Sequence, residues 1–270
     1  MNLGPLFGLD GMRERARRRK NGLAALHQLR DDERHVYVVH YSCESFYDRE
    51  GGPAPKATSI AVRQWSSGST ESFSVHQCAE ELGIAPADIT ARYDEIERRL
   101  LSSFYECVRS KDGATWVHWN MRDINYGFPA LAHRARILGV EPAHIDDSKK
   151  VDLARLLVDL HGVGYAPHPR MASLTAINKI TNKDGLTGQE EADAFEAGQY
   201  VKMHLSTLRK VDVMAGILGR AVDGSLITKS TLTERYGSHL GVAVGFVTEH
   251  WIVSVLGFIA TIAGIVALFV

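Results

Sequence analysis

The sequence predicts an α/β domain, in which helices flank a mixed sheet, followed by one transmembrane helix at the C-terminal end. Two β-rich segments, residues 36–41 (VYVVHY) and 115–119 (TWVHW), have the length and composition of buried strands. Helical periodicity prevails in most of the other segments. Residues 251–270 carry no charged side chain, and twenty helical residues match a bilayer hydrocarbon core of roughly 30 Å.

Each further element follows from its local pattern, in chain order. A helix is expected to include the basic run at residues 12–20 (MRERARRRK) and to continue to Leu29. Residues 49–56, rich in glycine and proline, predict a loop, and a hairpin is expected to turn at Ser66-Ser67-Gly68. Its strands are expected at residues 58–65 and 69–76, and the later helices at residues 89–110, 126–138, 151–161 and most of 190–220. This order of elements suits a mixed sheet flanked by helices: three strands come first, then a helix, a strand and mostly helices.

The basic run at residues 12–20 has two interpretations. It is either the solvated surface of a helix or a contact for anionic lipid or a phosphate backbone. Both stay open on the sequence alone.

The composition narrows the class of protein. A formal net charge of −1 argues against a protein that coats nucleic acid by bulk positive charge, although local basic patches remain open. Three cysteines at wide spacing, Cys43, Cys78 and Cys107, indicate reduced thiols rather than a disulfide framework or a zinc site. The first ten residues lack the apolar core of a signal peptide.

The uncharged C-terminal stretch predicts a single membrane span. A buried core helix is the alternative, but such helices seldom run this long without a polar face. Lys229 and Arg235 precede the stretch, and no charged side chain follows it. The positive-inside rule then leaves the N-terminal part in the cytoplasm, which predicts a single-pass protein of the inner membrane.

Small and weakly polar residues form a stripe along this predicted helix. Gly237, Gly241 and Gly245 recur every fourth residue before it, in a segment too short to cross a membrane alone. The stripe is interpreted either as a packing face for self-association or as a pore wall, and both require several copies of the chain. Its residues are Glu249, His250, Ser254, Gly257, Thr261 and Gly264.

Three short segments resemble the motifs of DEDD-type 3′→5′ exonucleases, a family with the ribonuclease H-like fold. At the end of the first strand (VVHYSCES), Glu44 occupies the glutamate position and Ser42 stands where that family has its first aspartate. The second segment (VHWNMRD) offers His118, Asn120 and Asp123. In the third (YVKMHLSTLRKVD), His204 matches the family's histidine, whereas Arg209 replaces its aspartate. The resemblance covers about residues 35–222 and implies the ribonuclease H-like fold.

The departures from these motifs imply binding without cleavage. The family's four carboxylates hold two divalent metal ions, and a serine hydroxyl is a poor substitute for a shared carboxylate ligand. A guanidinium beside the site would repel a metal ion and attract a phosphate. We therefore expect no catalytic activity, no metal and no cofactor. Phosphates would be held by Arg209, Lys210 and Lys202, and a base would stack on Trp119 or Tyr126.

Each of these residues also has a simpler interpretation. Glu44 is then a surface carboxylate, and His118 and His204 are structural histidines. Arg209 and Lys210 would form a solvated face or pair with the nearby Asp212 and Asp223. Their joint fit to one fold favours the functional interpretation.

The combined architecture is similar to the membrane effectors of the Hailong anti-phage defence system. That resemblance implies a homo-oligomer, in that family a tetramer, which a single-stranded DNA oligomer holds silent. It also implies a partner nucleotidyltransferase that makes the oligomer, and a lipid bilayer that the released effector disrupts through a channel or helix bundle. The alternatives are an active metal-dependent 3′→5′ exonuclease tethered to the membrane and a scaffold that only recruits a partner there.

The domain boundaries follow from these segments. We expect a basic N-terminal helix at residues 1–34, the exonuclease-like domain at residues 35–228, the glycine-ridged juxtamembrane segment at residues 229–249 and the transmembrane helix at residues 250–270.

Overall fold

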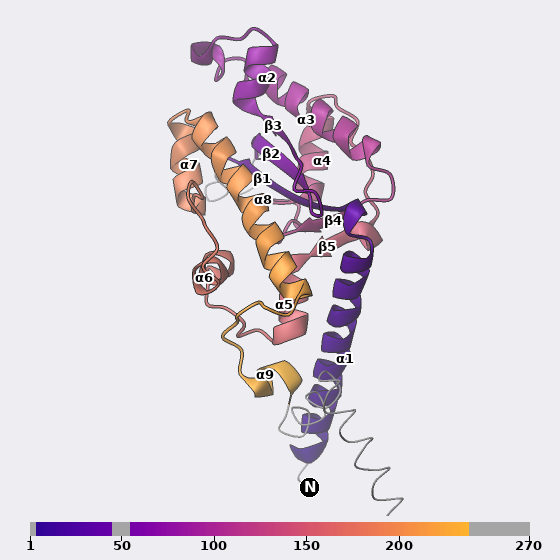
Figure 1. Ribbon diagram of the computed structural model, residues 1–270. Helices are drawn as coiled ribbons and strands as arrows, with labels where there is room; N and C mark the ends of the chain where they lie inside the picture. The colour runs from indigo at the N-terminus through magenta and orange to yellow at the C-terminus, as the bar shows by residue number, and fades with distance from the viewer. Residues whose placement is uncertain (1–3, 45–54, 238–270) are drawn as a thin grey trace, which may run out of the picture. The chain divides into compact units, whose positions relative to one another are not determined.

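The computed structural model describes residues 4–44 and 55–237 and shows an α/β fold with five strands and nine α-helices in those residues (Figure 1). The strands are β1 (Val36–Cys43), β2 (Ala57–Gln64), β3 (Thr70–Ser74), β4 (Thr115–His118) and β5 (Lys150–Asp152). The helices are α1 (Gly4–Asp31), α2 (Val75–Glu81), α3 (Tyr93–Ser110), α4 (Phe128–Ile137), α5 (Leu153–His161), α6 (Arg170–Ile177), α7 (Gly188–Glu196), α8 (Tyr200–Val222) and α9 (Leu232–Tyr236).

The chain divides into two compact units. The sheet unit consists of Leu26–Leu156 and Pro169–Ile227 and contains all five strands. The terminal unit consists of Met1–Ala25, Leu157–His168 and Thr228–Val270. Its described part contains most of α1, the end of α5 and the whole of α9.

The sheet is mixed and has the strand order β3-β2-β1-β4-β5. β2 pairs antiparallel with both β1 and β3, as the predicted hairpin requires, and Gly68 makes its turn at a φ of +76°. β4 pairs parallel with both β1 and β5. Parallel neighbours need crossover connections, which α2, α3 and α4 provide.

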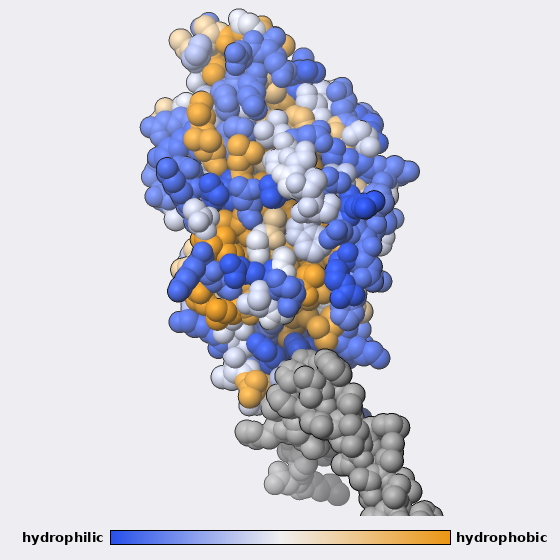
Figure 2. Space-filling model, in the orientation of Figure 1, coloured by the Kyte–Doolittle hydropathy of each residue, from blue (hydrophilic) through white to orange (hydrophobic). Residues whose placement is uncertain are grey.

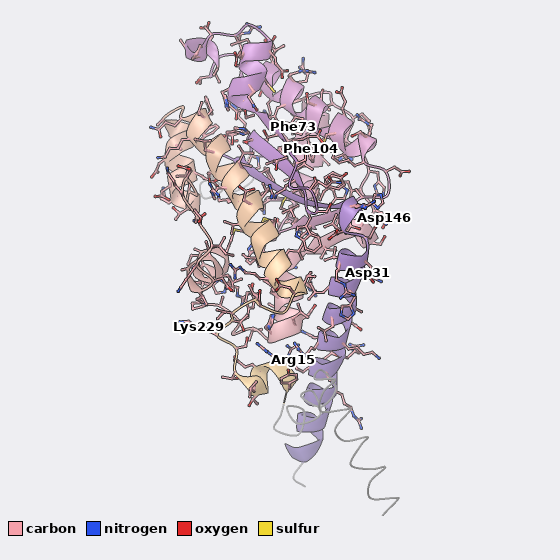
Figure 3. All side chains as sticks on the ribbon, in the orientation of Figure 1. Arg15, Asp31, Phe73, Phe104, Asp146 and Lys229 are labelled. Atoms are coloured by element: carbon pink, nitrogen blue, oxygen red, sulfur yellow. The ribbon has the colours of Figure 1, made fainter. Side chains whose placement is uncertain are left out.

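Both faces of the central strand are buried, so β1 contributes to two layers. Val39 and Tyr41 point into a hydrophobic core with residues of α3 and α4. In that core the rings of Phe73 and Phe104, labelled in Figure 3, meet edge to face with their centroids 6.3 Å apart. α8 packs on β1 and β2 at the other face. Because side chains alternate along a strand, His40 and Ser42 face α8.

The outer surface of the sheet unit is mixed in polarity. Figure 2 shows apolar patches between hydrophilic residues on one face of the molecule. On α8, Val201 and Leu205 remain 55% and 46% exposed, one helical turn apart. All three cysteines are buried and unbridged, as their spacing predicted.

The predicted elements are confirmed with shifted ends. The helix expected from residue 89 begins at Tyr93, and the one expected from residue 151 begins at Leu153, because Lys150–Asp152 form β5. α2, α6 and α9 were not predicted from the sequence. Gly198, at a φ of +64°, lies in the break between α7 and α8, where one largely helical stretch was expected.

Several predictions fall outside the described residues. Most of the expected loop at residues 49–56, the glycine ridge beyond Gly237 and the predicted span at residues 250–270 belong to this group. Within residues 4–44 and 55–237, no helix combines the length and apolar character that a membrane span needs.

Candidate nucleic-acid site

The candidate site lies where the parallel strands β1 and β4 end. Ser42 is near the carboxyl end of β1, and Trp119 directly follows β4. α8 lies across the sheet and presents Ser206, Thr207 and Lys210 on one helical face. In open α/β sheets, ligands commonly bind outside the carboxyl ends of the strands.

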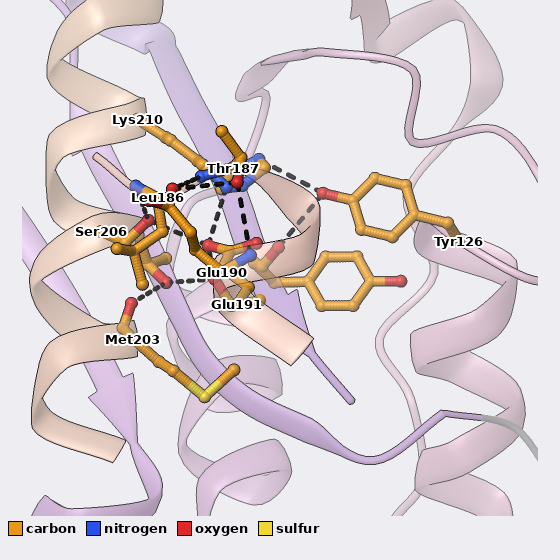
Figure 4. Close-up of polar contacts among 12 residues, drawn as sticks. Tyr126, Leu186, Thr187, Glu190, Glu191, Met203, Ser206 and Lys210 are labelled. Carbon is orange, nitrogen blue, oxygen red and sulfur yellow. Dashed lines mark hydrogen bonds and ion pairs between the residues drawn. The ribbon is translucent and has the colours of Figure 1, made fainter. Parts of the chain in front are cut away.

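Five side chains form a polar cluster here, which we call the Glu191 cluster: Ser42, Glu191, Ser206, Thr207 and Lys210 (Figure 4). Oε1 of Glu191 accepts hydrogen bonds from Ser42 Oγ at 2.8 Å and from Ser206 Oγ at 2.9 Å. Lys210 Nζ lies 2.7 Å from the same oxygen. One carboxylate oxygen therefore holds two hydroxyls and an ammonium.

Local structure fixes Glu191 in this position. It lies in the first turn of α7, which begins with a capping box between Thr187 and Glu190. The side chains of Glu191 and Lys210 are only 13% and 16% exposed. Charge-assisted hydrogen bonds gain strength as water is excluded, so this ion pair is stronger than a surface pair.

A cavity of about 360 Å³ adjoins the cluster, and we call it the Trp119 pocket. Lys210, Trp119 and His40 line it. Met171 and Leu186 are among its apolar lining residues. The pocket thus combines an aromatic ring, a cation and apolar walls, which is the set of groups that holds a nucleotide.

His40 supplies a polar group without a partner at the wall of this pocket. Its Nε2 is buried and has no hydrogen-bond partner among the described residues, whereas its Nδ1 lies 3.3 Å from the Tyr126 hydroxyl. Burial, and then the charge of Lys210, lower the pKa of His40 well below its usual value. The ring is neutral at pH 7. Because Tyr126 gives its hydroxyl hydrogen to the Tyr41 carbonyl, Nδ1 of His40 donates to the Tyr126 oxygen and Nε2 is an acceptor.

Some predicted residues meet in this region. Ser42 and Lys210 share Glu191, and Trp119 shares the pocket with Lys210. Tyr126 stacks on Tyr41 with ring centroids 4.6 Å apart and donates its hydroxyl hydrogen to the Tyr41 carbonyl at 3.1 Å. Tyr126 therefore positions the end of β1, and it touches the pocket through His40.

Glu44 is buried rather than a surface carboxylate. Its Oε1 accepts from the Lys56 backbone N–H at 2.7 Å, and its own N–H donates to the Lys56 carbonyl at 3.0 Å. These bonds tie the end of β1 to the start of β2.

The cation that shares Glu191 with Ser42 is Lys210, whereas Arg209, which the motif placed at this site, makes its contacts elsewhere. Arg209 Nε donates to the Lys183 carbonyl at 2.8 Å, and its Nη1 lies 3.6 Å from Asp212. Consecutive helical residues point about 100° apart, so only one of the two can face the sheet. The simpler interpretation of Arg209, a pair with Asp212, is the one observed.

Two other predicted residues of α8, His204 and Lys202, lie outside the Glu191 cluster. His204 is buried, with Nδ1 at 2.8 Å from Ser59 Oγ and its ring 5.2 Å from that of His76. Burial lowers the pKa of His204 to about 4, so it is a neutral residue of the layer between α8 and the β2–β3 hairpin. Lys202 is exposed.

The segment after β4 forms a turn of its own. His118 Nδ1 accepts from the Met121 N–H at 3.1 Å, and burial lowers the pKa of His118 to about 4. Asn120 adopts a φ of +55°, and its Oδ1 accepts from Arg122 at 3.2 Å. Asp123 caps the turn by accepting from the Asn125 N–H at 2.8 Å. These contacts support structural roles for all three predicted residues.

These side chains do not fit a two-metal site. Ser42 gives its hydroxyl hydrogen to Glu191, and the ammonium of Lys210 neutralises that carboxylate. Within the described part of the chain, no group of three or more histidine, cysteine or acidic side chains is placed to hold a metal ion.

The sequence analysis missed two residues of the site, His40 and Glu191. His40 lies two residues before Ser42 on the same face of the strand, so the alternation of side chains already pointed to His40. The capping box of α7 was visible as Thr187-Gly-Gln-Glu190, but nothing in the sequence linked Glu191 to Ser42.

No protein-family profile matches the chain, and no curated protein sequence matches it. Among solved structures, it is similar to the family B DNA polymerase from the hyperthermophilic archaeon Pyrobaculum calidifontis, with a TM-score of 0.45 and 16% sequence identity. The similarity covers 74% of this chain and 28% of that structure, so the chain spans under a third of the polymerase.

Proposed function

We propose that the sheet unit has a ribonuclease H-like fold and binds the end of a single-stranded nucleic acid in the Trp119 pocket without cutting it. The strand order, with three antiparallel strands followed by two parallel ones, supports this fold. One observation carries the binding role: Lys210 belongs both to the Glu191 cluster and to the pocket wall.

The proposed binding uses three groups of the pocket. The ammonium of Lys210 pairs with a phosphate, and the ring of Trp119 stacks with a base, which is recognition by charge and stacking. Nε2 of His40 accepts a hydrogen bond from a sugar hydroxyl. In this proposal Ser42, which replaces the family's first aspartate, gives its hydrogen bond to Glu191 instead of to a metal ion.

The membrane part of the proposal rests on the sequence. The uncharged residues 251–270 anchor an oligomer of this chain in the inner membrane, with the sheet unit in the cytoplasm. Bound single-stranded DNA then biases the oligomer between a silent and a membrane-disrupting arrangement, which requires different affinities in the two states. The role is that of an anti-phage effector, and its partner is a nucleotidyltransferase that makes the DNA oligomer.

The test is a fluorescence anisotropy titration of short, 5′-labelled single-stranded DNA with the detergent-extracted full chain at fixed salt. Loss of a stacked base costs about 1–3 kcal/mol, so Trp119→Ala is expected to weaken binding roughly 5- to 150-fold. Lys210→Met is expected to weaken it more than Lys149→Met, which removes the same charge from an exposed position.

Two outcomes would count against the proposal. The proposed binding is wrong if no DNA binds near physiological salt, or if Lys210→Met and Lys149→Met change the affinity for DNA equally. Shortened DNA after incubation with Mg²⁺ or Mn²⁺ would instead favour the membrane-tethered exonuclease. The scaffold alternative predicts neither binding nor cleavage.

A further inference from the structure

The terminal unit contains a basic cluster that the nucleic-acid proposal does not use. Arg15 and Arg19 lie one turn apart on α1, and Arg235 lies on α9. Arg15 Nε donates to the Glu234 carbonyl at 2.8 Å, and its Nη1 donates to the Asp159 carbonyl. Figure 3 labels Arg15. We call Arg15, Arg19, His161, Ser230 and Arg235 the terminal-unit cluster.

The cluster holds buried polar atoms without partners. Arg15 Nη2, Arg235 Nε, Ser230 Oγ and His161 Nδ1 are buried and have no hydrogen-bond partner among the described residues. Buried polar atoms in folded proteins are almost always paired, and each exception needs an explanation. Two of these atoms belong to guanidinium groups, which can only donate. The missing partner is therefore an acceptor.

The local charge also favours an anion. Burial, followed by the charge of Arg19, lowers the pKa of Arg15, and Asp159 is the acidic side chain that opposes these effects. Burial and then the charges of Arg235, Arg19 and Arg15 lower the pKa of His161 to about 3. His161 is thus neutral at pH 7, and the cluster carries three guanidinium charges, which the carboxylate of Asp159 partly opposes.

The backbone holds α9 close to the end of α5. A Cβ on Gly162 would lie 2.9 Å from the Glu234 carbonyl oxygen, and one on Gly164 would lie 2.3 Å from a Glu234 side-chain oxygen. A capping box between Thr231 and Glu234 starts α9. Arg235 is therefore held by a defined backbone, although α9 has only five residues.

We propose that the terminal-unit cluster binds a phosphate-type oxyanion, either free or as part of a lipid headgroup. Arg15 and Arg235 donate to its oxygens, and Ser230 supplies a hydroxyl. Arg19, whose Nη1 donates to the Leu160 carbonyl at 2.6 Å, adds a further positive charge. Guanidinium groups suit phosphate-type oxyanions because they keep their charge and their N–H groups form charge-assisted hydrogen bonds with the oxygens. The site is independent of the Trp119 pocket, since none of its residues belongs to the sheet unit.

The first arm of the test measures free phosphate. Inorganic phosphate is titrated against the detergent-extracted full chain, with sodium chloride at matched ionic strength as the control and the melting temperature as the readout. Phosphate is expected to raise the melting temperature in a saturable manner. Arg15→Gln and Arg235→Gln are each expected to weaken the apparent affinity about tenfold or more. Arg13→Gln, an exposed change on the same helix, is expected to leave it unchanged.

The second arm uses short-chain phosphatidylglycerol, with short-chain phosphatidylcholine and a matched neutral detergent as comparisons. Saturable stabilisation by phosphatidylglycerol that Arg15→Gln removes identifies a lipid headgroup as the source. Stabilisation by inorganic phosphate alone identifies a soluble phosphate. If neither ligand stabilises the wild-type chain beyond its control, the proposal is wrong.

The wild-type titrations decide the question even if an arginine variant fails to fold. Lys210→Met separates this site from the nucleic-acid proposal: it is expected to reduce DNA binding and to leave the phosphate effect intact. A phosphate effect that disappears in Lys210→Met and persists in Arg15→Gln would contradict the assignment to the terminal unit.

Discussion

Replacing Glu191 with glutamine should tighten nucleic-acid binding and weaken folding. In the Glu191 cluster the carboxylate occupies Lys210 at 2.7 Å, where a ligand phosphate would have to compete with it. Glutamine keeps an oxygen for the hydroxyls of Ser42 and Ser206 but carries no charge. The change therefore removes the competing anion and preserves the shape of the site.

The size of both effects follows from the strength of the hydrogen bond between Glu191 and Lys210, whose side chains are mostly shielded from water. A hydrogen bond between charged groups contributes about 1.5–3 kcal/mol, and the retained neutral bonds offset part of that loss. We expect glutamine to destabilise the fold by about 1–2 kcal/mol. In the variant, a ligand phosphate does not have to displace a carboxylate from Lys210. If the same amount, about 1–2 kcal/mol, is added to the binding free energy, the affinity for single-stranded DNA should rise about 5- to 30-fold.

The assay is the anisotropy titration at one salt concentration, paired with urea unfolding of the same variant. Glu196→Gln is the matched control, because it removes the same charge from an exposed position on α7. Weaker DNA binding by a folded Glu191→Gln variant would refute the reasoning. It would mean that Glu191 orients Lys210 for the ligand instead of competing with it.

Three further predictions concern the scaffold. Arg134→Met breaks the ion pair with Glu97, whose side chain is 0% exposed, and should cost about 3–5 kcal/mol in urea unfolding; a loss below about 1 kcal/mol would contradict this. His204 has a pKa of about 4 when folded, below its ordinary value of 6.5, so stability should fall as the pH drops from 6.5 towards 4, by roughly 2 kcal/mol at pH 5. His204→Asn should flatten that profile, and an unchanged slope would contradict the assignment. At Gly127 a Cβ would lie 2.3 Å from the backbone of Met121, so Gly127→Ala should lower the melting temperature, whereas Gly219→Ala, which meets no atom within 4 Å, should not.

The fold was largely predictable because its main elements have clear periods. The β-rich composition of residues 36–41 and the hairpin turn at Gly68 identified the antiparallel half of the sheet. β5 was not predictable, because its three residues are too few to show an alternation and precede α5 directly. Its position comes from pairing with β4, which is a tertiary interaction.

The candidate site was predictable only in part. The motif spacing selected Arg209, whereas the helical pattern of α8 selects Lys210, which lies three and four residues after Thr207 and Ser206 on the same face. Glu191 comes from a separate helix and reaches Ser42 through a long-range contact, so no local pattern could reveal it. Motif matching identified the strand, and packing decided which side chains meet there.

The two edges of the sheet restrict how copies of this chain can join. β3 has five residues and β5 has three, so each outer strand offers few backbone groups for another strand to pair with. On β3, Glu71 also carries a charge that Lys111 holds at 2.6 Å. Continuous pairing from one subunit to the next is therefore disfavoured at both sides of the described sheet. Within the described residues, contacts between copies would therefore use side-chain surfaces rather than strand pairing.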